Sequence, residues 1–149
     1  MTGGIRTTNP FELLTAEHDL LRRNLGTAIE TAREGGRRKE GQAALRALLA
    51  AFRQHLRLEE KALYPACERL FGGPESAMIV LRADHEAIEK AIDRLAPGTL
   101  AREGIHDRLI DLAGILAAHL SREERVLFPL ASSRMSGAES TFLLRKLRK

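Results

Sequence analysis

The sequence predicts an all-α protein, an up-down-up-down four-helix bundle with a short basic helical tail at its C-terminal end. Apolar residues recur at three- and four-residue steps over long stretches, and no useful length of sequence alternates like a strand. Gly and Pro divide the chain into four long segments, each of helical length. The 149 residues fit a single domain, with the bundle at about residues 10–131 and the tail at 132–149.

The first two helices are predicted from signals at their ends. Asn9-Pro10 opens the first, because proline is tolerated in a first helical turn, and Gly35-Gly36 ends it. Gly41 precedes the second helix, which runs toward Pro65. The apolar stripes are Leu14, Leu21, Leu25 and Ile29 in the first helix and Leu45, Leu48, Phe52, Leu56 and Leu63 in the second.

The third and fourth helices follow the same logic. Gly72-Gly73-Pro74 precedes the third and Pro97-Gly98 closes it, and the fourth runs from about Thr99 to Pro129. Their stripes are Met78, Leu81, Ile88 and Ile92 in the third helix and Leu109, Leu112, Leu116, Leu120 and Leu127 in the fourth. Beyond them, residues 139–149 form a short basic amphipathic segment, which packs across the end of the bundle, binds a partner or frays; packing is the favoured interpretation.

An internal repeat runs through these helices. The segment from His55 to Pro65 aligns with the segment from His119 to Pro129: His, Leu, two Glu, Leu, an aromatic residue and Pro recur at the same spacing. A weaker pair precedes each copy, Glu17-His18-Asp19 and Asp84-His85-Glu86. Each half therefore supplies one helix with a single His and one helix with His-x3-Glu.

The repeated polar residues fall on the apolar stripes. At about 100° per residue, a Glu four positions after a His lies about 40° around the helix, one turn further along. Relative to Phe52 and Leu116, both His-x3-Glu pairs project to the buried side, and His18 and His85 lie among stripe residues of their own helices. The candidate metal ligands are His18, His55, Glu59, His85, His119 and Glu123.

Six such groups facing one apolar core would lose hydration, and the two carboxylates would repel each other. A pair of di- or trivalent cations removes both costs, because the cations neutralise the carboxylates and accept the imidazole lone pairs. Mixed nitrogen and oxygen donors without sulfur favour iron, then manganese or zinc. The sequence therefore predicts a dinuclear site with bridging carboxylates.

Other polar and aromatic residues receive different interpretations. Glu60 and Glu124 point away from the stripe and are expected to be solvated or ion-paired, and Glu89 lies on a face that could reach the site. Tyr64 and Phe128 are expected to cap the core, with Tyr64 a candidate hydrogen-bond donor to the site. His106 is interpreted as a surface residue and Cys67, the single cysteine, as a bystander without a disulfide partner in the chain.

These residues resemble the hemerythrin-like family, specifically its HHE cation-binding domain, over about Pro10 to Ala131. The resemblance implies a non-haem di-iron centre (Fe2+/Fe3+) with a bridging oxo or hydroxo group, and Glu59 and Glu123 as bridging carboxylates. It also implies a small ligand, oxygen, nitric oxide or peroxide, and roles in oxygen carriage or sensing, in the response to oxidative or nitrosative stress, or in the repair of damaged iron centres.

The sequence departs from the oxygen-carrying members at one position. Their fifth His ligand lies four residues after the His of the third helix, where this chain has Glu89. Either Glu89 supplies an oxygen ligand or a coordination position is open to small molecules. Ferritin-like di-iron oxidases are the structural rival, but their Glu-x2-His pattern occurs in a fitting form only once, at Glu103 and His106, and is rejected.

Composition narrows the remaining function classes. The formal charge is only +4 and much of it lies in residues 145–149, without aromatic residues interleaved as single-stranded nucleic acid prefers, so a nucleic-acid role is not favoured. No apolar run has the length of a membrane span, and no signal peptide is recognisable, which predicts a cytoplasmic protein. Two alternatives are left open. One is an enzyme with catalase-like or oxidase activity at an open di-iron site, and the other is an interaction module whose metals only stabilise the bundle and whose basic tail docks an acidic protein partner.

Overall fold

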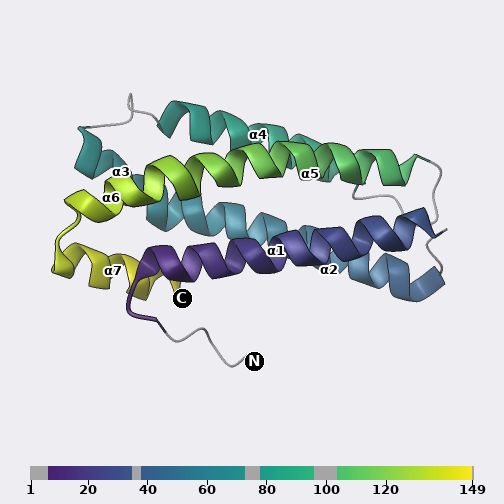
Figure 1. Cartoon of the computed structure of the whole chain (residues 1–149), viewed down its shortest axis with the longest axis horizontal. Helices are drawn as coiled ribbons and strands as arrows, with labels where there is room; N and C mark the ends of the chain where they lie inside the picture. Colours follow the sequence, from purple (N-terminus) through teal and green to yellow (C-terminus); the bar gives the residue numbers. More distant parts are fainter. Residues whose placement is uncertain (1–6, 35–37, 73–77, 96–103, 149) are drawn as a thin grey trace.

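The computed structural model describes residues 7–34, 38–72, 78–95 and 104–148, with the side chains of 38–42 left out. Within these ranges the chain is helical and contains no strand, so the predicted all-α bundle is confirmed. The described helices form four long rods: α1 (Pro10–Arg33); α2 (Arg38–Leu58) with η1 (Glu59–Leu63) and α3 (Tyr64–Phe71); α4 (Met78–Leu95); and α5 (Ile105–Arg122) with η2 (Glu123–Leu127) and α6 (Phe128–Arg134). These rods lie roughly parallel to one another, as Figure 1 shows.

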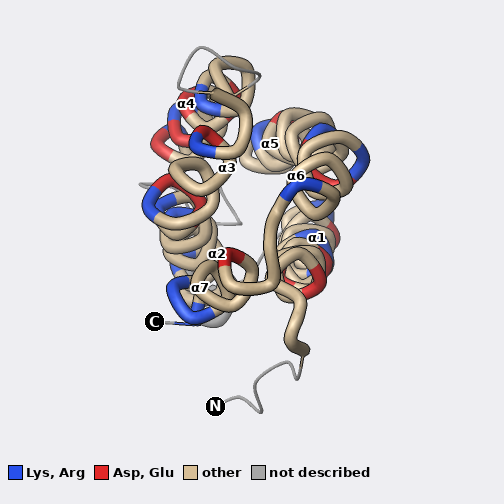
Figure 2. The backbone as a smooth tube through the Cα atoms, turned by 90° about the vertical axis from the view of Figure 1, so that its left-hand side faces the viewer, with Lys and Arg blue, Asp and Glu red and all other residues tan. Residues whose placement is uncertain are grey.

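The rods surround a shared core. Backbone contacts join α1 to α2 and α5, and α4 to α5 and α2. Figure 2 views the rods from one end, with α1 and α5 on one side and α2 and α4 on the other. Lys, Arg, Asp and Glu are spread over the helices in that view, which fits a bundle whose outer faces meet water. In the described part of the chain, no helix is both long and apolar enough to cross a membrane.

Local sequence explains several helix ends. The Asn9 side chain accepts hydrogen bonds from the backbone N–H groups of Phe11 and Glu12, and Pro10 occupies the first turn as predicted. After Phe71 the chain leaves α3 through Gly72, whose φ of 89° is a left-handed conformation that glycine adopts without steric cost. The expected breaks at Gly35-Gly36 and Pro97-Gly98 lie outside the described residues.

Three predicted boundaries are wrong. α2 begins at Arg38, so Gly41 lies in its first turn, where backbone N–H groups lack helical partners in any case. Pro65 and Pro129 do not end their rods, because each follows a π-helical turn, η1 or η2. In that wider turn Tyr64 and Phe128 donate their backbone N–H to the carbonyls of Glu59 and Glu123, which eases the clash that a proline ring otherwise makes with the preceding turn.

The tail forms a helix, α7 (Gly137–Leu147), as predicted, and it packs on the bundle, against α1 and η1. Ser136 and Glu139 form a reciprocal capping box at its start. The buried Leu143, Leu144 and Leu147 belong to the same apolar cluster as residues of η1 and of the first turns of α1.

The core is divided into two apolar clusters. One contains Leu21, Phe52, Ile88 and Leu116 with their neighbours, and the other contains Leu14, Ala62, Leu81 and Leu127 with the apolar face of α7. Along every rod, the change from one cluster to the other occurs at a residue of the predicted site. The predicted ligands therefore form a polar layer across the middle of an otherwise apolar core.

Candidate metal centre

Each rod contributes one histidine to the polar layer. The four are His18 on α1, His55 on α2, His85 on α4 and His119 on α5. All are buried, with at most 5% of their surface exposed. Their rings meet edge-on in two pairs, His18 with His55 and His85 with His119, each with ring centroids 4.8 Å apart.

Glu59 lies between the two histidine pairs and is completely buried. Its Oε2 atom is 2.9 Å from His55 Nε2 and 3.2 Å from His18 Nε2. Its Oε1 atom is 2.9 Å from His85 Nε2. One carboxylate therefore offers a different oxygen to each pair.

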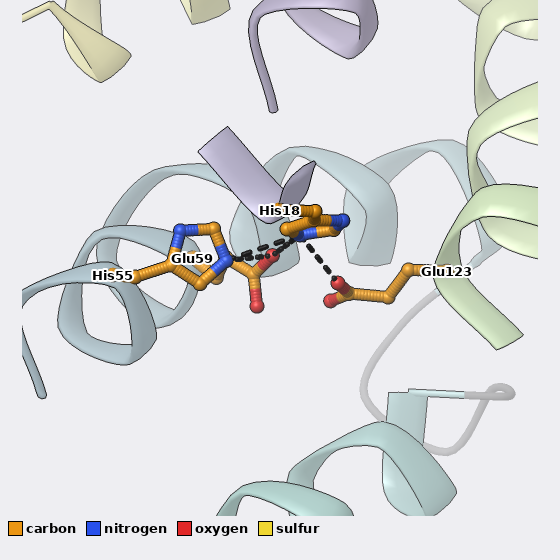
Figure 3. Close-up of side chains that lie close together, drawn as sticks. All are labelled: His18, His55, Glu59 and Glu123. Carbon is orange, nitrogen blue, oxygen red and sulfur yellow. Dashed lines mark hydrogen bonds and ion pairs between the residues drawn. The ribbon is translucent and has the colours of Figure 1, made fainter. Parts of the chain in front are cut away.

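Glu123 repeats this arrangement from the opposite rod. Its Oε1 atom lies 3.3 Å from His18 Nε2, and its Oε2 atom lies 3.3 Å from His119 Nε2. Figure 3 shows His18 and His55 converging with both carboxylates. Like Glu59, Glu123 has no exposed surface, so both acids have exchanged water for imidazole nitrogens.

The six residues make two groups that could each hold a metal ion. The first consists of His18, His55, Glu59 and Glu123, and the second of Glu59, His85, His119 and Glu123. In each group the ligand atoms lie within 4.8 Å of one another. Both groups contain both carboxylates. The structure thus brings together every residue that the sequence predicts as a ligand.

The donor set fits a cation. His119 Nε2 and Glu123 Oε1 are buried and make no hydrogen bond within the described part of the chain. Leaving a buried polar atom unsatisfied costs about 1–3 kcal/mol. A cation would accept the imidazole lone pair and neutralise the carboxylate, and nitrogen and oxygen donors suit iron, manganese or zinc.

Without a cation, the buried carboxylates raise the pKa values of neighbouring imidazoles, and the imidazoles lower the pKa of Glu59. Burial on its own lowers the pKa of His18 and His55, but the neighbouring carboxylates outweigh it and raise these pKa values to about 9 and about 10. The same balance raises the pKa of His119 to about 10. Burial opposes ionisation of Glu59, yet the charge of His55 and hydrogen bonds from the imidazoles hold its pKa well below the ordinary value.

The part of the chain that contains these buried histidines and glutamates matches a known protein family. The family model of the hemerythrin HHE cation-binding domain matches residues 9–131, which is most of the chain. The chain belongs to the hemerythrin HHE cation-binding family. Comparisons with curated proteins and with solved structures found no match. Membership implies cation binding, typically of iron, and the two His/Glu groups are where this HHE domain has suitable donors.

In this HHE domain, a carboxylate supports the outer nitrogen of every site histidine. The Nδ1 contacts are His18 with Glu124 at 2.7 Å, His85 with Glu60 at 2.7 Å, His119 with Asp84 at 3.0 Å and His55 with Glu17 at 3.3 Å. Such partners fix the imidazole's orientation and tautomer and leave Nε2 facing the centre. Glu60 and Glu124 are ion-paired, one of the two predicted possibilities, but the sequence did not predict that their partners are His85 and His18.

Two of these outer carboxylates are themselves held by arginines. Glu124 pairs with Arg22 at 2.9 Å, and both oxygens of Asp84 pair with Arg122 at 2.9 Å. Burial alone would raise the pKa of both acids, but these contacts lower it. Both stay ionised and able to accept from His18 and His119.

The outer carboxylates are recognisable in the sequence, because each is adjacent to a candidate ligand. An acid directly precedes each single histidine (Glu17 and Asp84), and an acid directly follows each ligand glutamate (Glu60 and Glu124). Glu60 and Glu124 each reach the single histidine of the other half of the repeat. The repeat makes this set recognisable, but its pairings cross between rods and cannot be obtained from spacing along one helix.

Tyr64 enters the site, whereas its counterpart Phe128 does not supply a polar group. The Tyr64 hydroxyl donates to Glu123 Oε2 at 2.8 Å and lies 2.8 Å from His85 Nε2. Burial, and then the charges of Glu59 and Glu123, raise the pKa of Tyr64, so its hydroxyl keeps its proton. The Phe128 ring stacks on His18 with centroids 5.8 Å apart.

The remaining candidates lie outside both groups. Glu89 is exposed and belongs to neither. The side chain of His106 is 38% exposed, near the start of α5, consistent with a surface residue, and Glu103 lies outside the described residues. Cys67 is buried in the apolar cluster that contains α7, where desolvation raises the pKa of its thiol to about 12.

Proposed function

We propose that this chain is a non-haem di-iron protein that binds or reacts with a small diatomic or peroxidic ligand. One iron ion would occupy each His/Glu group, and Glu59 and Glu123 would contact both ions. The observation that carries the proposal is the division of each carboxylate: one oxygen faces the His18 side and the other faces the His85–His119 side.

The residues of the chain prepare the site for this role. The four Nδ1 contacts hold the imidazoles with Nε2 inward, and burial excludes bulk water from the carboxylates. Bound iron would supply the redox chemistry and the affinity for oxygen, nitric oxide or peroxide.

The protein residues do not supply a full set of donors for two iron ions. Each group offers four protein residues, and Glu89, at the place of the carriers' fifth histidine, is exposed rather than directed at the site. Since iron with nitrogen and oxygen ligands commonly takes about six donors, this set favours sensing or reaction over carriage. Stress response, repair of iron centres and a cytoplasmic location remain predictions of the sequence.

The deciding experiment measures iron per chain and the visible spectrum of protein produced in iron-replete cells. The proposal expects one iron for each of the two groups, absorption typical of oxygen-bridged ferric pairs, and a spectral change on adding nitric oxide or peroxide. A folded protein that takes up zinc in preference to iron, or no metal, would contradict it.

A second candidate function follows from α7. Between α7 and η1–α3 lies a groove of about 530 Å³, lined by apolar residues together with the basic Lys61, Arg69 and Lys146 and one acid, Glu139, so its charged residues are mostly basic. Phe142 beside it is 47% exposed. An acidic protein segment would complement the basic residues of this groove. In that case the metal ions would only stabilise the fold of the bundle. Redox-silent metal, together with binding of an acidic peptide that is lost on K61E/K146E, would favour this alternative.

A further inference from the structure

The two halves of the repeat differ at one place next to the shared carboxylates. Tyr64 and Phe128 occupy equivalent positions in the repeat, each directly after a π-helical turn. Tyr64 brings a hydroxyl to Glu123 and His85, whereas Phe128 brings only an apolar ring against His18. The polar surroundings of the two metal groups are therefore unequal.

We propose that Tyr64 is a positioning residue that makes the two cation positions unequal, weakening cation binding at the one formed by His85 and His119. This inference rests on the proposed dinuclear centre and assigns different properties to its halves. The weaker position is then the one whose coordination changes more readily when a small ligand arrives.

The hydrogen bond acts on one end of one carboxylate. Tyr64 donates to Oε2 of Glu123, the oxygen that faces His119, while Oε1, which faces His18, makes no hydrogen bond in the described part of the chain. A carboxylate oxygen that already accepts a hydrogen bond has less electron density to give to a cation. Glu59 is the counterpart of Glu123 in the repeat, and among the described residues its Oε2 atom has contacts only with imidazoles.

The outer carboxylates also differ between the halves, since Asp84 and Arg122 support His119 whereas Glu17 supports His55 at a longer distance. Inequality in the unmodified protein would therefore not by itself identify its cause. The informative quantity is the change that follows when the phenol is removed, or when one is added in the other half.

The test compares the unmodified chain with Y64F and its mirror variant F128Y, using Co²⁺ alone as the probe. Stepwise dissociation constants come from calorimetry and from the visible absorbance of bound Co²⁺. We expect Y64F to lower the dissociation constant of the weaker Co²⁺ by about tenfold, and F128Y to raise the dissociation constant of the stronger one. In both variants the two dissociation constants should therefore lie closer together than in the unmodified chain. With ⁵⁷Fe, Mössbauer spectra of Y64F should change for one iron site and not the other.

Equal shifts of both steps in Y64F, or changes within about twofold, would overturn the inference, because a residue that only packs the core would act on both positions alike. Circular dichroism of each variant separates these results from misfolding, and Y64F alone decides if F128Y does not fold. Binding of a single Co²⁺ by the unmodified chain would instead overturn the dinuclear centre, and the inference with it.

Discussion

At the scale of single residues, the centre depends on the direction of each imidazole. The Nε2 atoms of all four site histidines face the two glutamates, while the Nδ1 atoms contact carboxylates on neighbouring rods. Inner donors and outer partners should therefore respond differently to substitution: losing a donor removes a cation position, and losing an outer partner weakens it.

We expect His119→Ala to lose the cation of the group formed with Glu59, His85 and Glu123, while the helical content stays close to that of the unmodified chain. The alanine removes a donor but keeps good helix propensity. Metal analysis combined with far-ultraviolet circular dichroism measures both quantities. The control is His106→Ala on the same helix, outside both groups; full metal content in His119→Ala would show that the ligand assignment is wrong.

Removing an outer carboxylate should reduce affinity without abolishing binding. Glu124→Gln loses the charged partner of His18 Nδ1, and we expect metal affinity to fall by about 10- to 100-fold. Competition with a chelator of known affinity measures the change. Glu89→Gln, an exposed acid outside both groups, serves as the control, and an equal effect in the two variants would contradict the orienting role of Glu124.

At the scale of elements, the π-helical turns η1 and η2 have the clearest consequence. Each begins at a candidate ligand, Glu59 or Glu123, and each carries its rod past a proline. Such turns are rare and concentrate at functional sites. Here they allow one continuous rod to contribute both a ligand to the centre and apolar residues to the second cluster.

Helix α7 packs against α1 and η1 through its buried leucines. Leu143 is 1% exposed, so Leu143→Ala should lower the free energy of unfolding by about 2–5 kcal/mol. The neighbouring Phe142 is 47% exposed, and Phe142→Ala should cost much less. Denaturant unfolding at constant metal content compares the two, and equal losses would mean that α7 does not pack as described.

At the scale of the whole molecule, protons and cations compete for the same buried layer. The pKa values of His18, His55 and His119 in the metal-free fold, about 9 to 10, lie above their ordinary value of 6.5. Groups with raised pKa values stabilise the fold fully below pH 6.5, and this stabilisation is lost as the pH rises through about 9 to 10.

We therefore expect the metal-free protein to lose stability between pH 6.5 and about 10, while its affinity for cations increases over the same interval because fewer protons must leave. Denaturant unfolding of the metal-free chain, and Co²⁺ titrations across this range, measure the two opposite slopes. Proton release on Co²⁺ addition in weakly buffered solution provides an independent check, and its absence would contradict the competition.

Much of the fold, and the burial of all six candidate ligands, could be inferred from sequence because both depend on helical periodicity. A residue four positions after His55 or His119 must share its helix face, and the apolar stripe identifies that face as buried. The repeat then distinguishes a doubled centre from isolated core histidines. None of this requires knowledge of how the rods are arranged around one another.

Contacts between rods, in contrast, were decided only by the tertiary structure. The pairing of Glu124 with His18, and the Tyr64 hydroxyl between Glu123 and His85, join residues far apart in the sequence. Helical periodicity gives a direction around one axis, but the distance between side chains on two axes depends on packing and on π-helical turns that shift the register. The sequence by itself thus determined which side chains face the core, and the packed bundle decided which of them meet.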